Sequence, residues 1–133
     1  MLFLFSFFCL MCNYKLFAQF AEKQKLLDSL IVNNWKTATV KVGDKFLTLD
    51  KVQSESRLLI SSNHIAQNIS NDLREYGKWK LDAVNMEITI GFGEALKIEP
   101  IIMKIIKLEK NKFVFSVSDE HSENITTFEC VPD

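Results

Sequence analysis

Apolar and polar residues alternate with a period of two from Trp35 to the end of the chain, and this alternation constrains the fold more than any other feature. Successive side chains of a strand point to opposite faces, so each alternating run predicts a strand with one buried face. Turn residues such as Gly43 and Asp44 separate the runs. The predicted strands are residues 35–42, 45–49, 57–61, 64–70, 76–82, 86–92, 101–109, 112–118 and 124–131.

The connections between these strands are too short for the crossover that parallel pairing requires, so neighbouring strands must pair antiparallel. Such a chain either closes into a barrel or folds into a sandwich. A short helix before the first strand favours the barrel. We therefore predict an all-β fold, an eight- or nine-stranded antiparallel up-and-down barrel with a short N-terminal helix.

The predicted helix lies in the stretch FAEKQKLLDSLIVNN, which begins at Phe20. Leu27, Leu30 and Ile31 recur at helical spacing, and charged residues of both signs occupy the other side. A helix that binds a membrane surface carries an excess of basic residues on its polar face. This mixed face instead favours a helix that lies across one end of the barrel and closes it.

The first 20 residues differ in composition from the rest, with an uninterrupted apolar run from Met1 to Cys12. The run is shorter than the roughly 20 residues that span a bilayer, and it resembles a signal-peptide core with a small residue, Ala18, before the cleavage point. We predict a signal peptide at residues 1–18, a barrel domain at residues 19–133, and a secreted or periplasmic protein. Two alternatives stay open: lipid attachment at Cys12, and retention of the segment as a membrane anchor.

The predicted mature chain is nearly neutral. Taking Lys15 from the 16 basic residues leaves 15 against 17 acidic ones. Nucleic-acid binding depends on clustered Lys and Arg, so we expect no nucleic-acid partner. Of the three cysteines only Cys130 lies after residue 18, so no disulfide can form within the mature domain.

Several of these features resemble the small secreted lipocalin-like domains of bacteria. They are a helix before a first strand that begins at Trp35, a strand reading GKWKLD, a strand reading NMEITI, and a final series of hairpins. The resemblance extends from about Leu27 to Val131, with Asn33 where lipocalins carry a glycine two residues before the tryptophan. It implies a barrel with a blind end near Trp35 and an open end that admits a small apolar ligand.

An eight-stranded barrel either is filled by its own side chains or holds one small ligand. The large apolar residues that we expect to face inward serve as ordinary core in the first case and as ligand contacts in the second. These candidate ligand-binding residues are Trp35, Trp79, Phe92, Met103, Phe113 and Phe115. The glycines in residues 91–100 make this segment the candidate for a loop at the mouth.

Candidates for catalysis are few. His64, His121 and Cys130 are the residues on which an enzyme hypothesis would rest, and Cys130 alternates with Phe128 as a buried thiol would. The acidic residues 119–123 fit a solvated hairpin tip better than a metal site. We predict no catalytic residues, no metal and no cofactor.

The leading hypothesis is a secreted, non-enzymatic binding protein that holds a small hydrophobic molecule. The alternative is a structural or protein-interaction module of the cell envelope with a filled barrel. Residues 57–61 and 101–109 support the alternative, because neighbouring apolar residues there cannot all face one core. They suggest a second covered surface, such as a homodimer interface.

Overall fold

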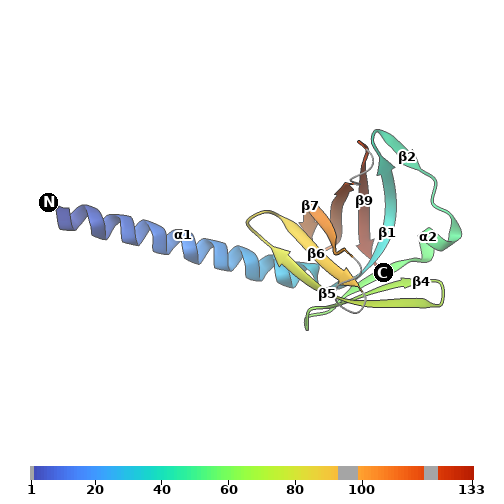
Figure 1. Ribbon diagram of the computed structural model, residues 1–133, viewed down its shortest axis with the longest axis horizontal. Helices are drawn as coiled ribbons and strands as arrows, with labels where there is room; N and C mark the ends of the chain where they lie inside the picture. Colours follow the sequence, from blue (N-terminus) through green and yellow to red (C-terminus); the bar gives the residue numbers. More distant parts are fainter. Residues whose placement is uncertain (1, 93–98, 119–122) are drawn as a thin grey trace.

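The computed structural model describes residues 2–92, 99–118 and 123–133, with side chains from residue 13 onward, and shows a β-barrel from which one long helix projects (Figure 1). The helices are α1 (Leu2–Ile31) and α2 (Lys51–Glu55). The strands are β1 (Asn33–Val42), β2 (Lys45–Leu47), β3 (Arg57–Ile60), β4 (Ile65–Ser70), β5 (Leu73–Asp82), β6 (Glu87–Phe92), β7 (Ile101–Glu109), β8 (Lys112–Ser118) and β9 (Ile125–Pro132).

The nine strands form one antiparallel sheet in the order β2-β1-β3-β4-β5-β6-β7-β8-β9, and pairing of β1 with β9 closes eight of them into a barrel. The first part of β1 pairs with β3 and its last part with β2, so β2 is an additional strand beside the mouth. Consecutive strands from β3 onward are neighbours, as in an up-and-down barrel. The predicted fold class is confirmed.

The strand boundaries differ from the prediction in several places, by one to three residues. Residues 71–75, which the predicted strands leave as a connection, belong to the β4–β5 hairpin, because Ser70 pairs with Leu73. Asn71 takes the left-handed conformation in its turn, with φ of 54°. The helix α2 was not predicted, and β2 ends at Leu47 instead of residue 49.

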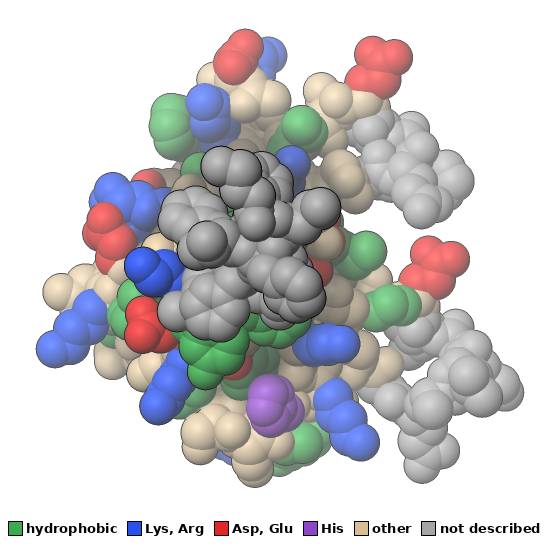
Figure 2. All heavy atoms as spheres, turned by 90° about the vertical axis from the view of Figure 1, so that its left-hand side faces the viewer, with side chains coloured by type: hydrophobic (Ala, Val, Ile, Leu, Met, Phe, Trp, Pro, Cys, Tyr) green, Lys and Arg blue, Asp and Glu red, His purple; other side chains and the backbone are tan. Residues whose placement is uncertain are grey.

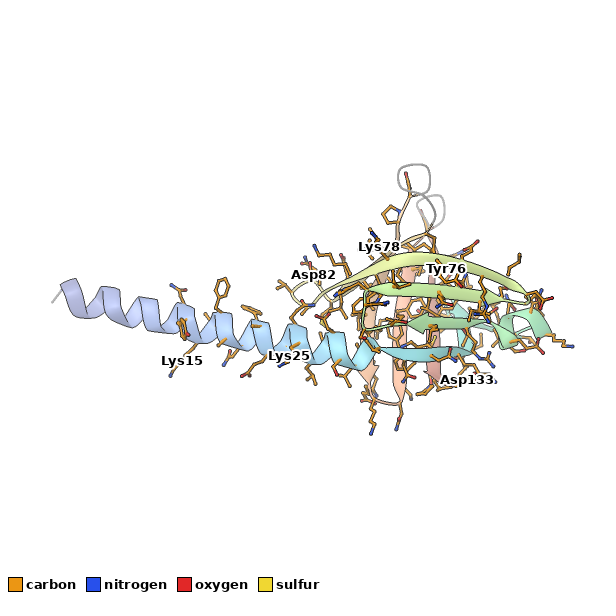
Figure 3. The ribbon with its side chains drawn as sticks, turned by 90° about the horizontal axis from the view of Figure 1, so that it is seen from below. Lys15, Lys25, Tyr76, Lys78, Asp82 and Asp133 are labelled. Carbon is orange, nitrogen blue, oxygen red and sulfur yellow. The ribbon has the colours of Figure 1, made fainter. Side chains whose placement is uncertain are left out.

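The predicted N-terminal helix is present, and it extends further toward the N-terminus than the stretch from Phe20. α1 is continuous over 30 residues, through the segment that the sequence assigns to a signal peptide, and residues 1–31 contain no glycine or proline to interrupt it. Figure 3 shows Lys15 on the part of α1 that projects away from the barrel. None of the helices in the described part of the chain combines the length and hydropathy needed to cross a membrane.

The last turns of α1 close one end of the barrel, as predicted. Leu27 and Ile31 are buried in the core there. The Gln24 side chain reaches the β5–β6 turn, where it donates to Leu81 O at 2.8 Å and accepts from Ala83 N at 3.0 Å. These two bonds satisfy backbone groups at the turn and fix the helix against it.

A hydrogen bond joins the helix end to the core. The Trp35 indole, 1% exposed, donates from Nε1 to Ile31 O at 2.8 Å. The bond pairs a carbonyl at the end of a helix with an indole N–H, both of which would otherwise be buried without a partner. Phe113 packs against Trp35 with ring centroids 5.5 Å apart.

Trp79 and Leu81 of β5 face the core, while Lys78 and Lys80 are exposed, so the inward orientation predicted for Trp79 is confirmed. Gly77 lies on the inner face opposite Phe92 of β6. A Cβ atom at Gly77 would lie 2.5 Å from Gly91 O and 2.9 Å from the Phe92 ring. The two strands therefore approach as closely as they do because residue 77 has no side chain.

We expect Gly77→Ala to destabilise the protein by about 1–3 kcal/mol, as overpacking does, because backbone atoms of β6 must move to admit the methyl group. Gly91→Ala is the matched control, since nothing lies within 4 Å of a Cβ at that position. It should change the free energy of unfolding by less than about 0.5 kcal/mol. Urea denaturation of both variants checks this, and equal effects would contradict the close approach.

Candidate functional site

The open half of the barrel contains a cavity of about 680 Å³. Its lining comes from both ends of the sheet and from α2, which lies beside the mouth between β2 and β3. Most of the lining is apolar, including Trp35, Val40, Phe92, Met103, Phe115 and Phe128. The volume lies within the range of small-molecule sites, about 300–1,000 Å³.

Four of the six predicted ligand-binding residues line this cavity: Trp35, Phe92, Met103 and Phe115. Phe113 does not, because it is fully buried beneath them. Trp79 lines a different cavity at the closed end. Of the six predicted residues, four therefore line the cavity of the open half, whereas Trp79 and Phe113 lie in the closed half of the barrel.

Aromatic rings form the floor of the cavity. From Trp35 and Phe113 the series continues through Phe115, 4.8 Å from Phe113, to Phe128, which stacks on Phe115 at 5.0 Å. Phe128 was not among the predicted site residues. Its alternation with Cys130 on β9 was the signal that could have found it, because the two side chains share one face.

A polar group of side chains lies on the wall formed by α2, β3 and β4, and the sequence prediction missed it. Gln53, Ser56, Arg57 and Asn68 belong to it. The capping box of α2, in which Asp50 Oδ1 accepts from Gln53 N at 2.8 Å, fixes the helix that carries Gln53. The spacing Asp50-x-x-Gln53 is the sequence signal for this helix, and the face shared with Ala66 is the signal for Asn68.

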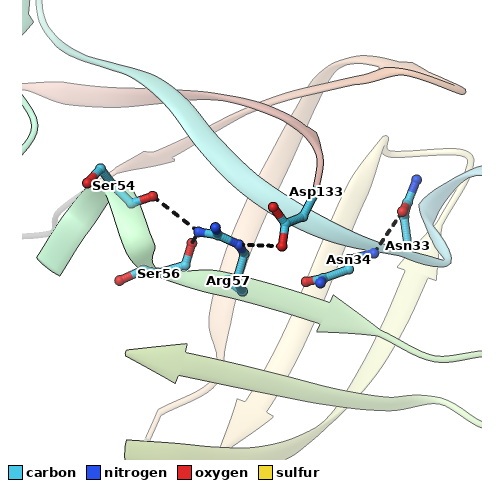
Figure 4. Close-up of polar contacts among 6 residues, drawn as sticks. All are labelled: Asn33, Asn34, Ser54, Ser56, Arg57 and Asp133. Carbon is cyan, nitrogen blue, oxygen red and sulfur yellow. Dashed lines mark hydrogen bonds and ion pairs between the residues drawn. The ribbon is translucent and has the colours of Figure 1, made fainter. Parts of the chain in front are cut away.

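Arg57 is held by three contacts (Figure 4). Its Nε lies 2.8 Å from Asp133 Oδ2, and its Nη1 donates to the carbonyls of Ser54 and Ser56 at 3.1 Å. The hydrogen bond and the positive charge of Arg57 hold the pKa of Asp133 below its usual range. Asp133 is therefore ionised at neutral pH, and it compensates the charge of the guanidinium.

Cys130 lines the cavity from β9 and is buried. Burial raises the pKa of its thiol to about 11, outweighing a hydrogen bond from Thr37 that lowers the pKa. The thiolate is the reactive form of cysteine, so this residue is protonated and weakly nucleophilic at neutral pH. It is a free cysteine.

A second, smaller cavity of about 360 Å³ lies at the closed end, between the end of α1 and the β3–β4 turn. His64 stacks on Trp79 there, with ring centroids 4.6 Å apart, and the Trp79 indole donates to Ser61 O at 2.8 Å. His64 and Cys130 thus belong to different cavities. His121 lies outside the described residues.

The described residues contain no group of three or more His, Cys, Asp or Glu side chains that could hold a metal ion. The predicted acidic tip, residues 119–123, lies outside the described residues except for Glu123, which is exposed. The predicted mouth loop, residues 91–100, likewise falls mostly outside them. On the face seen along α1, basic and acidic side chains are interspersed (Figure 2).

Comparison with known proteins finds no matching family, no similar curated protein and no similar solved structure. Function is therefore inferred from the cavity and the residues that line it.

We expect native Cys130 to resist alkylation by iodoacetamide at about pH 8, because a thiol with a pKa of about 11 is almost entirely protonated at that pH. The same reagent should label Cys130 rapidly in guanidinium chloride, where the thiol is solvated. Mass spectrometry of residues 19–133, which contain this cysteine alone, measures both rates. Equal labelling of native and unfolded protein would show that Cys130 is neither buried nor protected.

Proposed function

We propose that this protein is a non-enzymatic binding protein that holds a small hydrophobic molecule in the open half of its barrel. The observation that carries the proposal is the cavity of about 680 Å³ with a mainly apolar lining. At the roughly 30 Å³ that a water molecule occupies in the liquid, this volume holds at most about 20 non-hydrogen atoms. Removing apolar ligand surface from water would supply the binding energy, at about 25 cal/mol per Å².

The architecture also supports a lipocalin-like assignment. An eight-stranded antiparallel barrel, a helix over one end and an apolar cavity at the other are compatible with that group. The apolar N-terminal segment supports export, with a secreted or periplasmic location and membrane contact only through that segment. The proposal needs no cofactor, no metal and no nucleic-acid partner.

Blocking the cavity tests the proposal. Thr126→Trp places a large side chain in the cavity, whereas Thr127→Trp, the neighbouring residue of β9, places the same side chain on the outer face. We expect the first variant to weaken binding of a fluorescent fatty-alcohol probe by ~10-fold or more. The second should bind it like the unchanged protein.

Native mass spectrometry after exposure to a lipid extract complements the titration, because it detects a ligand without choosing one. Failure of the unchanged protein to bind the probe or to retain any extracted molecule would count against a binding function. Equal binding by both tryptophan variants would place the probe outside the barrel.

A specific observation favours the second candidate, an interaction module. Ile102 and Ile106 on the outer face of β7 are 53% and 57% exposed. These are the residues of the predicted two-sided strand 101–109 that the core does not cover. Light scattering during size-exclusion chromatography tests this candidate. If the unchanged protein is a dimer and the double variant Ile102→Lys with Ile106→Lys is a monomer, the result supports a homodimer interface. If the unchanged protein is a monomer at high concentration, this support is lost.

A further inference from the structure

We propose that the cavity selects an apolar molecule with an uncharged hydrogen-bonding end group, such as a long-chain alcohol or primary amide, over one that ends in a carboxylate or an ammonium group. This inference rests on the proposed binding function and specifies the chemical class of the ligand. It follows from the charges and the unused hydrogen-bonding capacity of the cavity wall.

The wall offers no uncompensated charge. Arg57 is the one charged side chain among the described residues that line the cavity. Its guanidinium already contacts Asp133 Oδ2 at 2.8 Å and donates to two carbonyls. A carboxylate entering this cavity would lose its hydration without gaining a free cation, and an ammonium group would find no free anion. Burying an unpaired ion is far more costly than burying a neutral polar group.

The wall does offer an unused amide. Asn68 of β4 lines the cavity and is half-buried, next to Leu58 of β3 in the sheet. Its side chain has no hydrogen-bond partner within the described part of the chain. An amide presents both donors and an acceptor. A hydroxyl group can therefore pair with either the N–H or the oxygen of this amide, and another amide can pair with both.

The other polar side chains on the same wall already make hydrogen bonds, although the Gln53 Nε2 group has no partner among the described residues. Ser56 Oγ donates to Val52 O at 2.8 Å, and Gln53 Oε1 accepts from Asp50 N at 3.1 Å. Asn68 is thus the side chain on this wall that offers both an unused donor and an unused acceptor, and we place the polar end of the ligand beside it. The apolar remainder would extend toward Met103, Phe115 and Phe128.

Folding alone gives little reason for an amide at this position. Neighbouring lining residues such as Leu58 are apolar, and the Asn68 side chain adds no hydrogen bond to the described structure. A polar residue that contributes nothing to stability at a binding surface is the usual compromise between stability and function. Asn68→Leu should therefore fold at least as stably as the unchanged protein.

The test is competition against the fluorescent fatty-alcohol probe by four molecules of equal chain length: dodecanol, dodecanamide, dodecanoate and dodecylammonium, all at neutral pH and below micelle formation. We expect the alcohol and the amide to displace the probe at concentrations ~10-fold lower than the two ions. Asn68→Leu should abolish this advantage. Gln67→Leu is the matched control, because Gln67 is the preceding residue of β4 on the outer face, and it should retain the advantage.

The Asp133→Asn variant is a second test, independent of Asn68, because it removes the carboxylate that compensates the charge of Arg57. It should improve displacement by dodecanoate relative to dodecanol. The inference is overturned if dodecanoate equals dodecanol in the unchanged protein, if Asn68→Leu keeps the preference, or if Asp133→Asn leaves it unaltered. Probe displacement without regard to end group overturns only this inference, whereas absence of probe binding overturns the proposed function as well.

Discussion

The hydrogen bond from the Trp35 indole to Ile31 O holds the end of α1 against the first strand at the closed end of the barrel. The bond spans the short link between α1 and β1. It therefore fixes the orientation of the last turn of α1 relative to the start of β1. Ile31 and Trp35 then become the bottom layer of the core, with Phe113 packed against the indole. Since β1 pairs with β3, β2 and β9, the placement of its first residues orients the seam that closes the barrel.

The two halves of the barrel differ because of side-chain size. Below the cavity, the side chains of Trp79, Ile88, Ile90 and Phe113 are buried and pack the interior, with the smaller cavity beside Trp79 at the closed end. Toward the mouth the inward positions carry smaller side chains, including Val42, Val117 and Thr126. An eight-stranded barrel has room for a layer of large side chains or for a small ligand. In this chain large side chains occupy the closed end, and a cavity occupies the open end.

The sequence predicted the strands well because alternation is a local signal that burial on one face imposes directly. It predicted Trp79 as inward-facing for the same reason, but it could not predict which cavity Trp79 would line, because that depends on distance along the barrel axis. It missed the five residues of α2, which are too few to show helical periodicity. It missed the polar wall because Gln53, Arg57 and Asn68 come together only through the pairing of β3 with β4 and the position of α2.

Arg57 and Asp133 link the structural and the selective properties of the site. The pair fastens the end of β9 to β3 across the first residues of β1, where Asp133 N also donates to Asn34 O at 2.9 Å. Contacts at this seam favour barrel closure, and the same ion pair cancels the one charge that the described cavity lining contains. Because no charged or polar side chain is fully buried in the described chain, the interior has no other fixed charge with which to attract an ion. The ion pair between Arg57 and Asp133 therefore leaves the α2–β3–β4 wall without a free charge. The wall can then discriminate between ligands through hydrogen bonding by Asn68.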